Sequence, residues 1–269
     1  MLPLHEGTVY GPVHSRRLGW SLGVNLMPRG VKLCSFNCAY CQYGWTRATA
    51  SPGRAGGEAW PAPAAVIRSV ATALERLSAQ RVPLSVVTLA GNGEPTLHPQ
   101  FAEIVAGLKE LRDRRAPSLK LAILSNASTL ANPKVVDALH ALDERFMKLD
   151  AGDPAVFRRI NNPGVALEEV VEGLGRLNDY IIQTMFVKDR LGRVDNTSDM
   201  AVALWISQLT RLRPRSVHVY TIDRDPAWPY LLPVPAVRLD EIARRARAAG
   251  LDVRVFPVAP PVAVAAAGH

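Results

Sequence analysis

Short apolar runs alternate with amphipathic segments of helical period along the whole chain, and this alternation constrains the fold most strongly. Each helical segment must bury its apolar stripe on a sheet, which requires parallel strands joined by right-handed crossovers. Seven runs are predicted as strands, and a helical pattern follows each of the first six. The predicted strands are residues 21–27, 85–90, 119–125, 145–150, 180–187, 216–222 and 252–256.

Six βα units are too few for a closed eight-stranded barrel, and no glycine-rich dinucleotide fingerprint opens the first helix. The sequence therefore predicts one α/β domain, a partial (βα)6 TIM-like barrel of parallel strands over residues 21–256. We expect residues 1–20 to form an N-terminal extension and residues 257–269 to form a Pro/Ala-rich tail. The irregular connection 42–63 has the length of loops that are functional or disordered.

The composition limits the compartment and the partners of the chain, but it does not indicate its chemistry. The 269 residues carry a formal net charge of +8, which permits RNA or an anionic cofactor as a partner. Three cysteines cannot all pair internally, no positively charged start leads into an apolar stretch, and no run approaches the length of a membrane span. We therefore expect a reduced, cytoplasmic protein with no membrane partner.

All three cysteines, Cys34, Cys38 and Cys41, lie in one stretch just after the first predicted strand, spaced C-x3-C-x2-C. Three thiolates from a short loop can bind three irons of a four-iron cluster and leave the fourth iron without a protein ligand. On spacing alone, zinc held by the cysteines and a histidine such as His14 is an alternative, as are unligated thiols. Zinc ligand pairs usually recur, and this chain has no second pair.

The segment CSFNCAYC, with Tyr40 just before the last cysteine, resembles the signature of the radical S-adenosylmethionine (SAM) superfamily. The segments GPVHSRRLGWSLGVN, LAGNGEPTLHP, KLDAGD, QTMFV and VYTIDRDP resemble the branch of tRNA wyosine-base synthases and uncharacterised iron-sulfur oxidoreductases. The resemblance implies an enzyme in which one [4Fe-4S] cluster on the three cysteines cleaves SAM to methionine and a 5'-deoxyadenosyl radical, which abstracts hydrogen from a substrate. It also implies an electron donor of the flavodoxin or ferredoxin type.

The same resemblance assigns cofactor-binding residues. Gly91-Asn92-Gly93-Glu94 resembles the family's glycine-glycine-glutamate motif, whose backbone receives the methionyl ammonium of SAM, although Asn92 departs from it. Active sites of parallel barrels lie at the carboxyl ends of the strands, so polar residues there are further candidates. Lys148 and Asp150 share one strand face, and a mutual ion pair is the alternative for them. The other cofactor-binding candidates are Tyr40, Ser125, Asn126, Gln183, Tyr220 and Thr221.

Three functions compete at this point: a radical enzyme, a zinc-stabilised basic RNA-binding module without catalysis, and a catalytically idle adaptor barrel. The RNA-binding module lacks interleaved aromatic residues on a short basic sheet, and the adaptor leaves the SAM-binding constellation unexplained. We therefore expect an enzyme, whose substrate is tRNA, a peptide or a small metabolite. Arg16 and Arg17 are either an anion site or a structural pair.

Overall fold

The structure, a computed structural model, describes residues 1–15, 17–46 and 60–257. Arg16, most of the 42–63 connection and nearly all of the predicted 257–269 tail lie outside the described residues. Within the described part of the chain, no helix is both long and apolar enough to cross a membrane.

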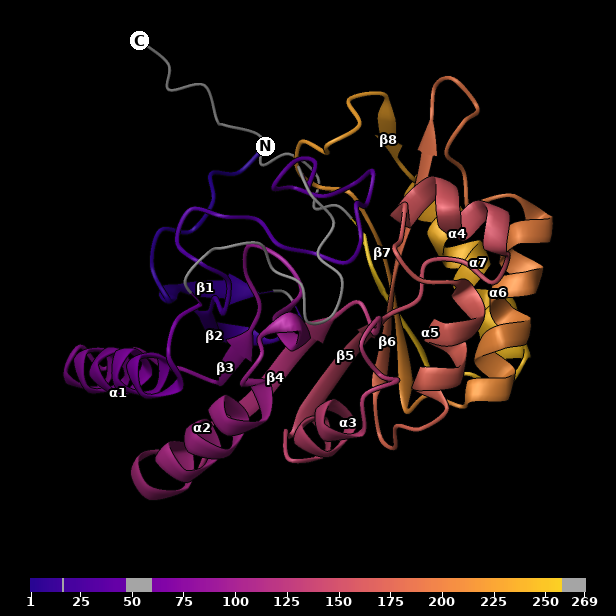
Figure 1. Ribbon diagram of the computed structural model, residues 1–269. Helices are drawn as coiled ribbons and strands as arrows, with labels where there is room; N and C mark the ends of the chain where they lie inside the picture. Colours follow the sequence, from indigo (N-terminus) through magenta and orange to yellow (C-terminus); the bar gives the residue numbers. More distant parts are fainter. Residues whose placement is uncertain (16, 47–59, 258–269) are drawn as a thin grey trace, which may run out of the picture.

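One sheet, curved and open, carries the whole domain (Figure 1). Its strands follow the spatial order β1-β2-β3-β4-β5-β6-β7-β9, and β8 pairs with β6 beside this path. Every pairing from β2 to β9 along the path is parallel, whereas β1 pairs antiparallel with β2. The strands are β1 (Val9–Ser15), β2 (Gly19–Val24), β3 (Val86–Leu89), β4 (Lys120–Ser125), β5 (Glu144–Lys148), β6 (Ile181–Asp189), β7 (Ser216–Thr221), β8 (Leu231–Pro233) and β9 (Val253–Phe256).

Helices connect the parallel strands and cover the outside of the curved sheet (Figure 1). Each of the six strands β2 to β7 is followed by at least one helix, so the predicted partial (βα)6 barrel is confirmed. Prolines at the first position of several helices and side-chain caps such as Asp153 explain where these helices begin. The helices are α1 (Pro63–Ala79), η1 (Pro95–Leu97), α2 (Phe101–Arg115), α3 (Pro133–His140), α4 (Pro154–Asn161), α5 (Leu167–Leu174), α6 (Asp199–Leu212) and α7 (Ala236–Ala248).

The structure adds elements that the sequence pattern did not predict. The segment expected to be an extension contains β1, whose Gly11 and Pro12 interrupt the strand pattern; the pairing with β2 shifts register between Tyr10 and Val13. An edge strand tolerates such an irregularity because one side needs no ladder partner. The short helix α4 and the three-residue strand β8 were also missed, because two turns or three residues give too little periodicity.

The core has two layers, one on each face of the barrel wall. The main cluster packs the outward-facing strand residues against the helices and includes Leu22, Ile123 and Met147. A smaller cluster fills the lumen near its base with Val86, Ala122, Phe146 and Ile181. Val86, Phe146 and Ile181 of this cluster also line a cavity at the base of the barrel.

The loop after β3 lies directly on the loop that carries the cysteines, residues 33–41, which we call the cysteine loop. Leu33 and Gly93 form an isolated parallel bridge, and the Glu94 N–H donates to the Leu33 carbonyl at 3.0 Å. A Cβ at Gly93 would lie 1.6 Å from that carbonyl oxygen. Only glycine allows this approach of two backbones.

Gly93→Ala should therefore lower the free energy of unfolding by about 1–3 kcal/mol, because the two loops must separate to admit the methyl group. Urea unfolding monitored by circular dichroism measures the change. Gly7→Ala is the control, since its added Cβ meets the nearest atom at an ordinary 3.5 Å. Equal midpoints for the two variants would contradict the packing described for Gly93.

Candidate active site

A cavity of about 430 Å³ opens at the carboxyl ends of the strands, where the cysteine loop meets the barrel mouth. Every residue predicted for the site lines this cavity except Asn92 and Asp150. The predicted residues in the wall are Cys34, Cys38, Tyr40, Cys41, Gly91, Gly93, Glu94, Ser125, Asn126, Lys148, Gln183, Tyr220 and Thr221.

Backbone hydrogen bonds to distant elements fix the cysteine loop. The N–H groups of Asn37 and Ala39 donate to the carbonyls of Asn161 and Ile160, at the end of α4, at 2.9 and 2.8 Å. From the connection after β7, the Trp228 N–H donates to the Ala39 carbonyl at 2.8 Å. The missed helix α4 is thus what holds the predicted loop in place.

The three cysteines are free thiols, and two of them accept hydrogen bonds from buried amides. Asn126 Nδ2 lies 3.5 Å from Cys34 Sγ, and Asn161 Nδ2 lies 3.4 Å from Cys38 Sγ. Burial raises the pKa of the Cys34 thiol well above its usual range. Burial also raises the pKa of Cys38 to about 11, although the Lys148 charge opposes the rise. A bound metal must therefore displace protons from these thiols.

The ligand geometry separates the two metal hypotheses. Among residues 1–15, 17–46 and 60–257, no three His, Cys, Asp or Glu side chains converge closely enough to hold one metal ion. Zinc requires its ligands at about 2.0–2.3 Å from a single ion, whereas each cysteine of an iron-sulfur cluster binds a different iron. His14, the alternative zinc ligand, lines the cavity with the cysteines, but it is exposed and lies edge-on to Trp20. The three thiols of one loop suit a cluster without requiring a fourth protein ligand.

Glu94 joins the ends of β3 and β4 at the cavity wall. It is 2% exposed, and its carboxylate accepts hydrogen bonds from Thr96 Oγ1 at 2.6 Å, Ser125 Oγ at 2.8 Å and the Asn126 N–H at 2.6 Å. Burial raises the pKa of Glu94 despite these donors. A buried carboxylate of this kind favours a cation next to it.

Asn92 faces away from the cavity, between the two glycines that line it. Its side chain accepts from the His5 N–H and donates to the His5 carbonyl, both at 2.8 Å. The Asn92 N–H also donates to Asn25 Oδ1 at 3.1 Å. In the described structure, this residue ties the N-terminal segment to the barrel mouth.

Asp150 lies behind the cavity wall, where it holds the cysteine loop against β5 and β6. Its carboxylate accepts from the Tyr40 hydroxyl, from Asn161 Nδ2 at 2.7 Å and from the Met185 N–H at 2.8 Å. Lys148 Nζ lies 3.8 Å from it. Burial alone would lower the pKa of Lys148, but the Asp150 carboxylate raises it overall. Lys148 is therefore a cation at neutral pH.

Aromatic rings and cations alternate across the cavity. Lys148 Nζ lies 4.9 Å from the centre of the Tyr40 ring and 3.2 Å from the Tyr220 hydroxyl. The Arg17 guanidinium also lies near Tyr220, 4.5 Å from the centre of its ring. Thr221 lines the cavity, but its hydroxyl already donates to the Phe186 carbonyl and accepts from the Val234 N–H.

The prediction from sequence missed other parts of the cavity wall. Met185 could have been found by strand alternation, since it follows Gln183 by two residues on β6. Phe256 is the register partner of Tyr220 on β9. Arg17 was predicted as part of an anion site or of a structural pair but not as a residue of this cavity, and Phe36 carries no signal of its own. Two further cavity residues, Lys32 and Arg224, add positive charge to the wall.

Asp150→Ala should lower the free energy of unfolding by about 3 kcal/mol, because it removes a fully buried hydrogen-bonding carboxylate and leaves the partly buried Lys148 without its counter-charge. Tyr40→Phe removes one hydrogen bond to the same carboxylate and should cost about 1–2 kcal/mol. Asp137→Ala, on the exposed face of α3, is the control and should change nothing. Thermal and urea unfolding of the three variants measure how their losses of stability rank. A loss for Asp150→Ala no larger than that for Tyr40→Phe would refute this role.

Comparisons with known proteins agree with this geometry. The sequence profile of the radical SAM superfamily matches residues 31–191, which is more than half of the chain. A UPF0026 protein of Helicobacter pylori is 33% identical over 237 residues, which cover 88% of this chain and 71% of that protein. A UPF0026 protein of Methanocaldococcus jannaschii is 29% identical over 231 residues, which cover 83% of this chain and 66% of that protein.

Solved structures share the fold at low sequence identity. A structure of TYW1 with a lysine-pyruvate adduct bound has a TM-score of 0.60 and 16% identity, over 85% of this chain and 73% of that chain. A radical SAM methyltransferase from Sphaerobacter thermophilus has a TM-score of 0.60 and 16% identity, over 88% of this chain and 66% of that chain. With the profile match and the UPF0026 relatives, the conclusion is that the chain belongs to the radical SAM superfamily.

Proposed function

We propose that this radical SAM enzyme holds one [4Fe-4S] cluster on Cys34, Cys38 and Cys41 and uses it to cleave SAM reductively. The observation that carries the proposal is that the three thiols lie on one anchored loop in the wall of the mouth cavity. When bound, the cluster and SAM together supply a 5'-deoxyadenosyl radical that abstracts hydrogen from the substrate. No fourth cysteine exists in the chain, so one iron remains available to SAM.

The remaining wall residues would bind and orient SAM. The backbone of Gly91 and Gly93 lines the cavity, and the buried Glu94 favours the methionyl ammonium beside it. Lys148 is a cation at the mouth and suits the carboxylate or ribose oxygens of SAM. Further polar contacts come from Ser125, Asn126, Tyr220 and Thr221, from Tyr40 in the cysteine loop, and from the side-chain carbonyl of Gln183. Asp150 and Asn92, which lie outside the cavity wall, would act by holding this wall in position.

Apolar side chains close the rest of the cavity. Phe36, Leu124, Met185 and Phe256 line it between the polar groups. Such a wall excludes water, and it holds the protein's own abstractable hydrogen atoms at fixed positions. Radical SAM enzymes need a reductant, and we propose a flavodoxin or ferredoxin type of donor for this one.

Protein purified anaerobically should be brown, with broad absorption near about 400 nm and about four irons per chain. Cys34→Ala, Cys38→Ala and Cys41→Ala should each abolish both the colour and SAM cleavage by dithionite-reduced protein, because each removes a ligand of the cluster. Iron and sulfide analysis with chromatographic detection of 5'-deoxyadenosine measures both losses.

Thr210→Ala, on the exposed face of α6, serves as the preparation control and should keep the iron and the activity. Colourless protein containing zinc would sink the proposal. A reproducible value near eight irons per chain, with matching sulfide, would show a second cluster and contradict the single-cluster assignment.

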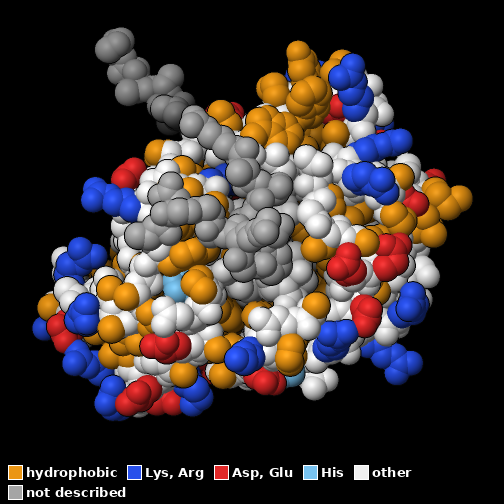
Figure 2. Space-filling view, viewed as in Figure 1, with side chains coloured by type: hydrophobic (Ala, Val, Ile, Leu, Met, Phe, Trp, Pro, Cys, Tyr) orange, Lys and Arg blue, Asp and Glu red, His pale blue; other side chains and the backbone are white. Residues whose placement is uncertain are grey.

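For the substrate, we propose RNA ahead of a peptide or a small metabolite. Arg17, Lys32 and Arg224 add positive charge to the wall of the mouth cavity, and the whole chain carries +8. On the face drawn in Figure 2, basic and acidic side chains are interleaved over the helices. We therefore expect the positive charge of the cavity wall, and not that of the helical surface, to contact the RNA. This places the RNA next to the proposed site of radical formation.

Affinity for bulk tRNA should fall at least about tenfold between about 50 and 200 mM salt, because phosphate contacts release counterions. Fluorescence anisotropy of labelled tRNA, with SAM present, measures the dependence. The affinity for a neutral peptide pool, measured at the same salt concentrations, is the comparison. No binding of tRNA at the low end would move the proposal to a peptide or a metabolite.

A further inference from the structure

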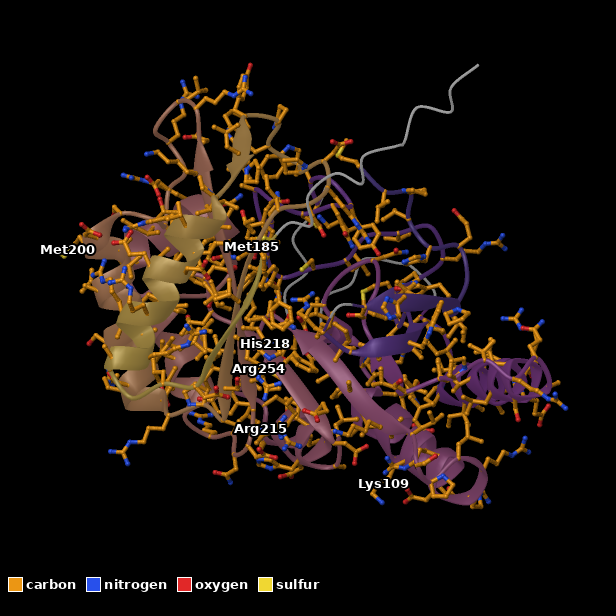
Figure 3. The ribbon with its side chains drawn as sticks, turned by 180° about the vertical axis from the view of Figure 1, so that it is seen from behind. Lys109, Met185, Met200, Arg215, His218 and Arg254 are labelled. Carbon is orange, nitrogen blue, oxygen red and sulfur yellow. The ribbon has the colours of Figure 1, made fainter. Side chains whose placement is uncertain are left out.

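A row of nitrogen-bearing side chains crosses the inner wall of the barrel from its mouth to its base. Lys148 on β5 is the register partner of Gln183 on β6, Gln183 is the partner of His218 on β7, and His218 is the partner of Arg254 on β9. Figure 3 shows Met185 above His218 and Arg254, with Arg215 below them, along this wall. The row thus connects the mouth cavity with the opposite end of the lumen.

That opposite end holds a second cavity, of about 690 Å³, at the amino ends of the strands. His218 and Arg254 line it, while Gln183 lines the mouth cavity. Arg17 lines both cavities. Its guanidinium therefore lies between the two, beside the Tyr220 ring.

Three side chains around this point have buried nitrogens without a hydrogen-bond partner in the described structure: Arg17 Nη1, Gln183 Nε2 and both ring nitrogens of His218. Gln183 is 5% exposed and His218 is 3% exposed. A buried donor left unpaired costs about 1–3 kcal/mol, so native proteins rarely collect several in one place without a ligand. Here the unpaired groups belong to register partners and to the arginine beside them.

The acids that line the base cavity are already paired or lie at its outer rim. Glu144, in the base cavity, accepts from Lys120 at 2.8 Å and pairs with Arg215. Asp252 lines the same cavity but is exposed. Burial, followed by the charges of Arg17 and Arg254, lowers the pKa of His218 to about 4, so its ring is neutral at pH 7. Water could bond to each of these nitrogens, but only an anion also neutralises the Arg17 guanidinium.

We propose that Arg17, Gln183 and His218 form an oxyanion site in the lumen, which takes a phosphate or carboxylate group of the substrate. His218 precedes Tyr220 by two residues on β7, so it lies about 6.6 Å deeper along that strand, while Arg17 and Gln183 reach the site from the mouth cavity. An anion held there would orient the substrate beneath SAM and present its reacting carbon towards the mouth. This inference rests on the proposed function for the identity of the mouth ligand, but its test needs no turnover.

The test is isothermal titration of the anaerobically purified full-length chain at pH 7, with inorganic phosphate and, separately, with malonate. Arg17→Met and His218→Phe should each weaken binding by roughly 10-fold to 100-fold, the effect of losing one charge-assisted or buried hydrogen bond. Arg211→Met, on the outer helix α6, removes the same charge far from the lumen and is the matched control. Equal affinities for all variants would overturn the proposal.

Two further measurements on the wild-type protein test the proposal independently of the variants. Wild-type crystals soaked in selenate should show anomalous density between Arg17 and His218, which decides the case even if a variant fails to fold; its absence would overturn the site. Repeating the phosphate titration with saturating SAM should leave the affinity unchanged, whereas competition would mean that the site holds the SAM carboxylate and not the substrate. Cluster content is measured on the same sample, so colourless protein that binds phosphate refutes the proposed function alone.

Discussion

The buried Asp150 carboxylate is the interaction on which the rest of the site depends. It receives the Tyr40 hydroxyl from the cysteine loop, Asn161 from the end of α4 and a backbone N–H from β6, and it balances the charge of Lys148. Asn161 in turn donates to Cys38 Sγ. One carboxylate therefore sets both the position of a proposed cluster ligand and the charge of the cavity wall.

The charge arrangement around this carboxylate also explains why the mouth can hold several cations at once. Lys148 is neutralised from behind, so its ammonium can face the cavity without leaving a net buried charge. Arg17 approaches the same wall from the β1–β2 turn and rests on the Tyr220 ring. The Tyr220 ring attracts both cations, which lie 4.5 and 5.7 Å from its centre.

The strands and the mouth cavity could be predicted from sequence because two strong signals coincide. The alternation of strand and helix patterns fixed the parallel order, and every predicted parallel strand overlaps an observed one, as β4 over residues 120–125 illustrates. Carboxyl ends of parallel strands meet at one edge, so Ser125, Lys148 and Tyr220 were expected together and do line one cavity. The cofactor roles of these residues stay predictions.

The sequence could not predict the contacts between residues that only the folded structure brings together. Asp150 and Asn92 belong to the right motifs, but only packing decides that neither side chain lines the cavity, since Asp150 lies behind Tyr40 and Asn92 binds His5. β1 was hidden by Gly11 and Pro12, and with it the reason why Arg17 enters the lumen. No sequence pattern distinguishes His218, and only the structure shows that both of its ring nitrogens are buried and unpaired.

The order of the described sheet begins at β1 and ends at β9, and these two margins are joined to the barrel by one neighbour each. A barrel closed by a full hydrogen-bond ladder must break that ladder to widen. Here β1 and β9 are not paired with each other in the described sheet. A bulky substrate that reaches the lumen between these two margins therefore requires no hydrogen-bond ladder of the wall to break.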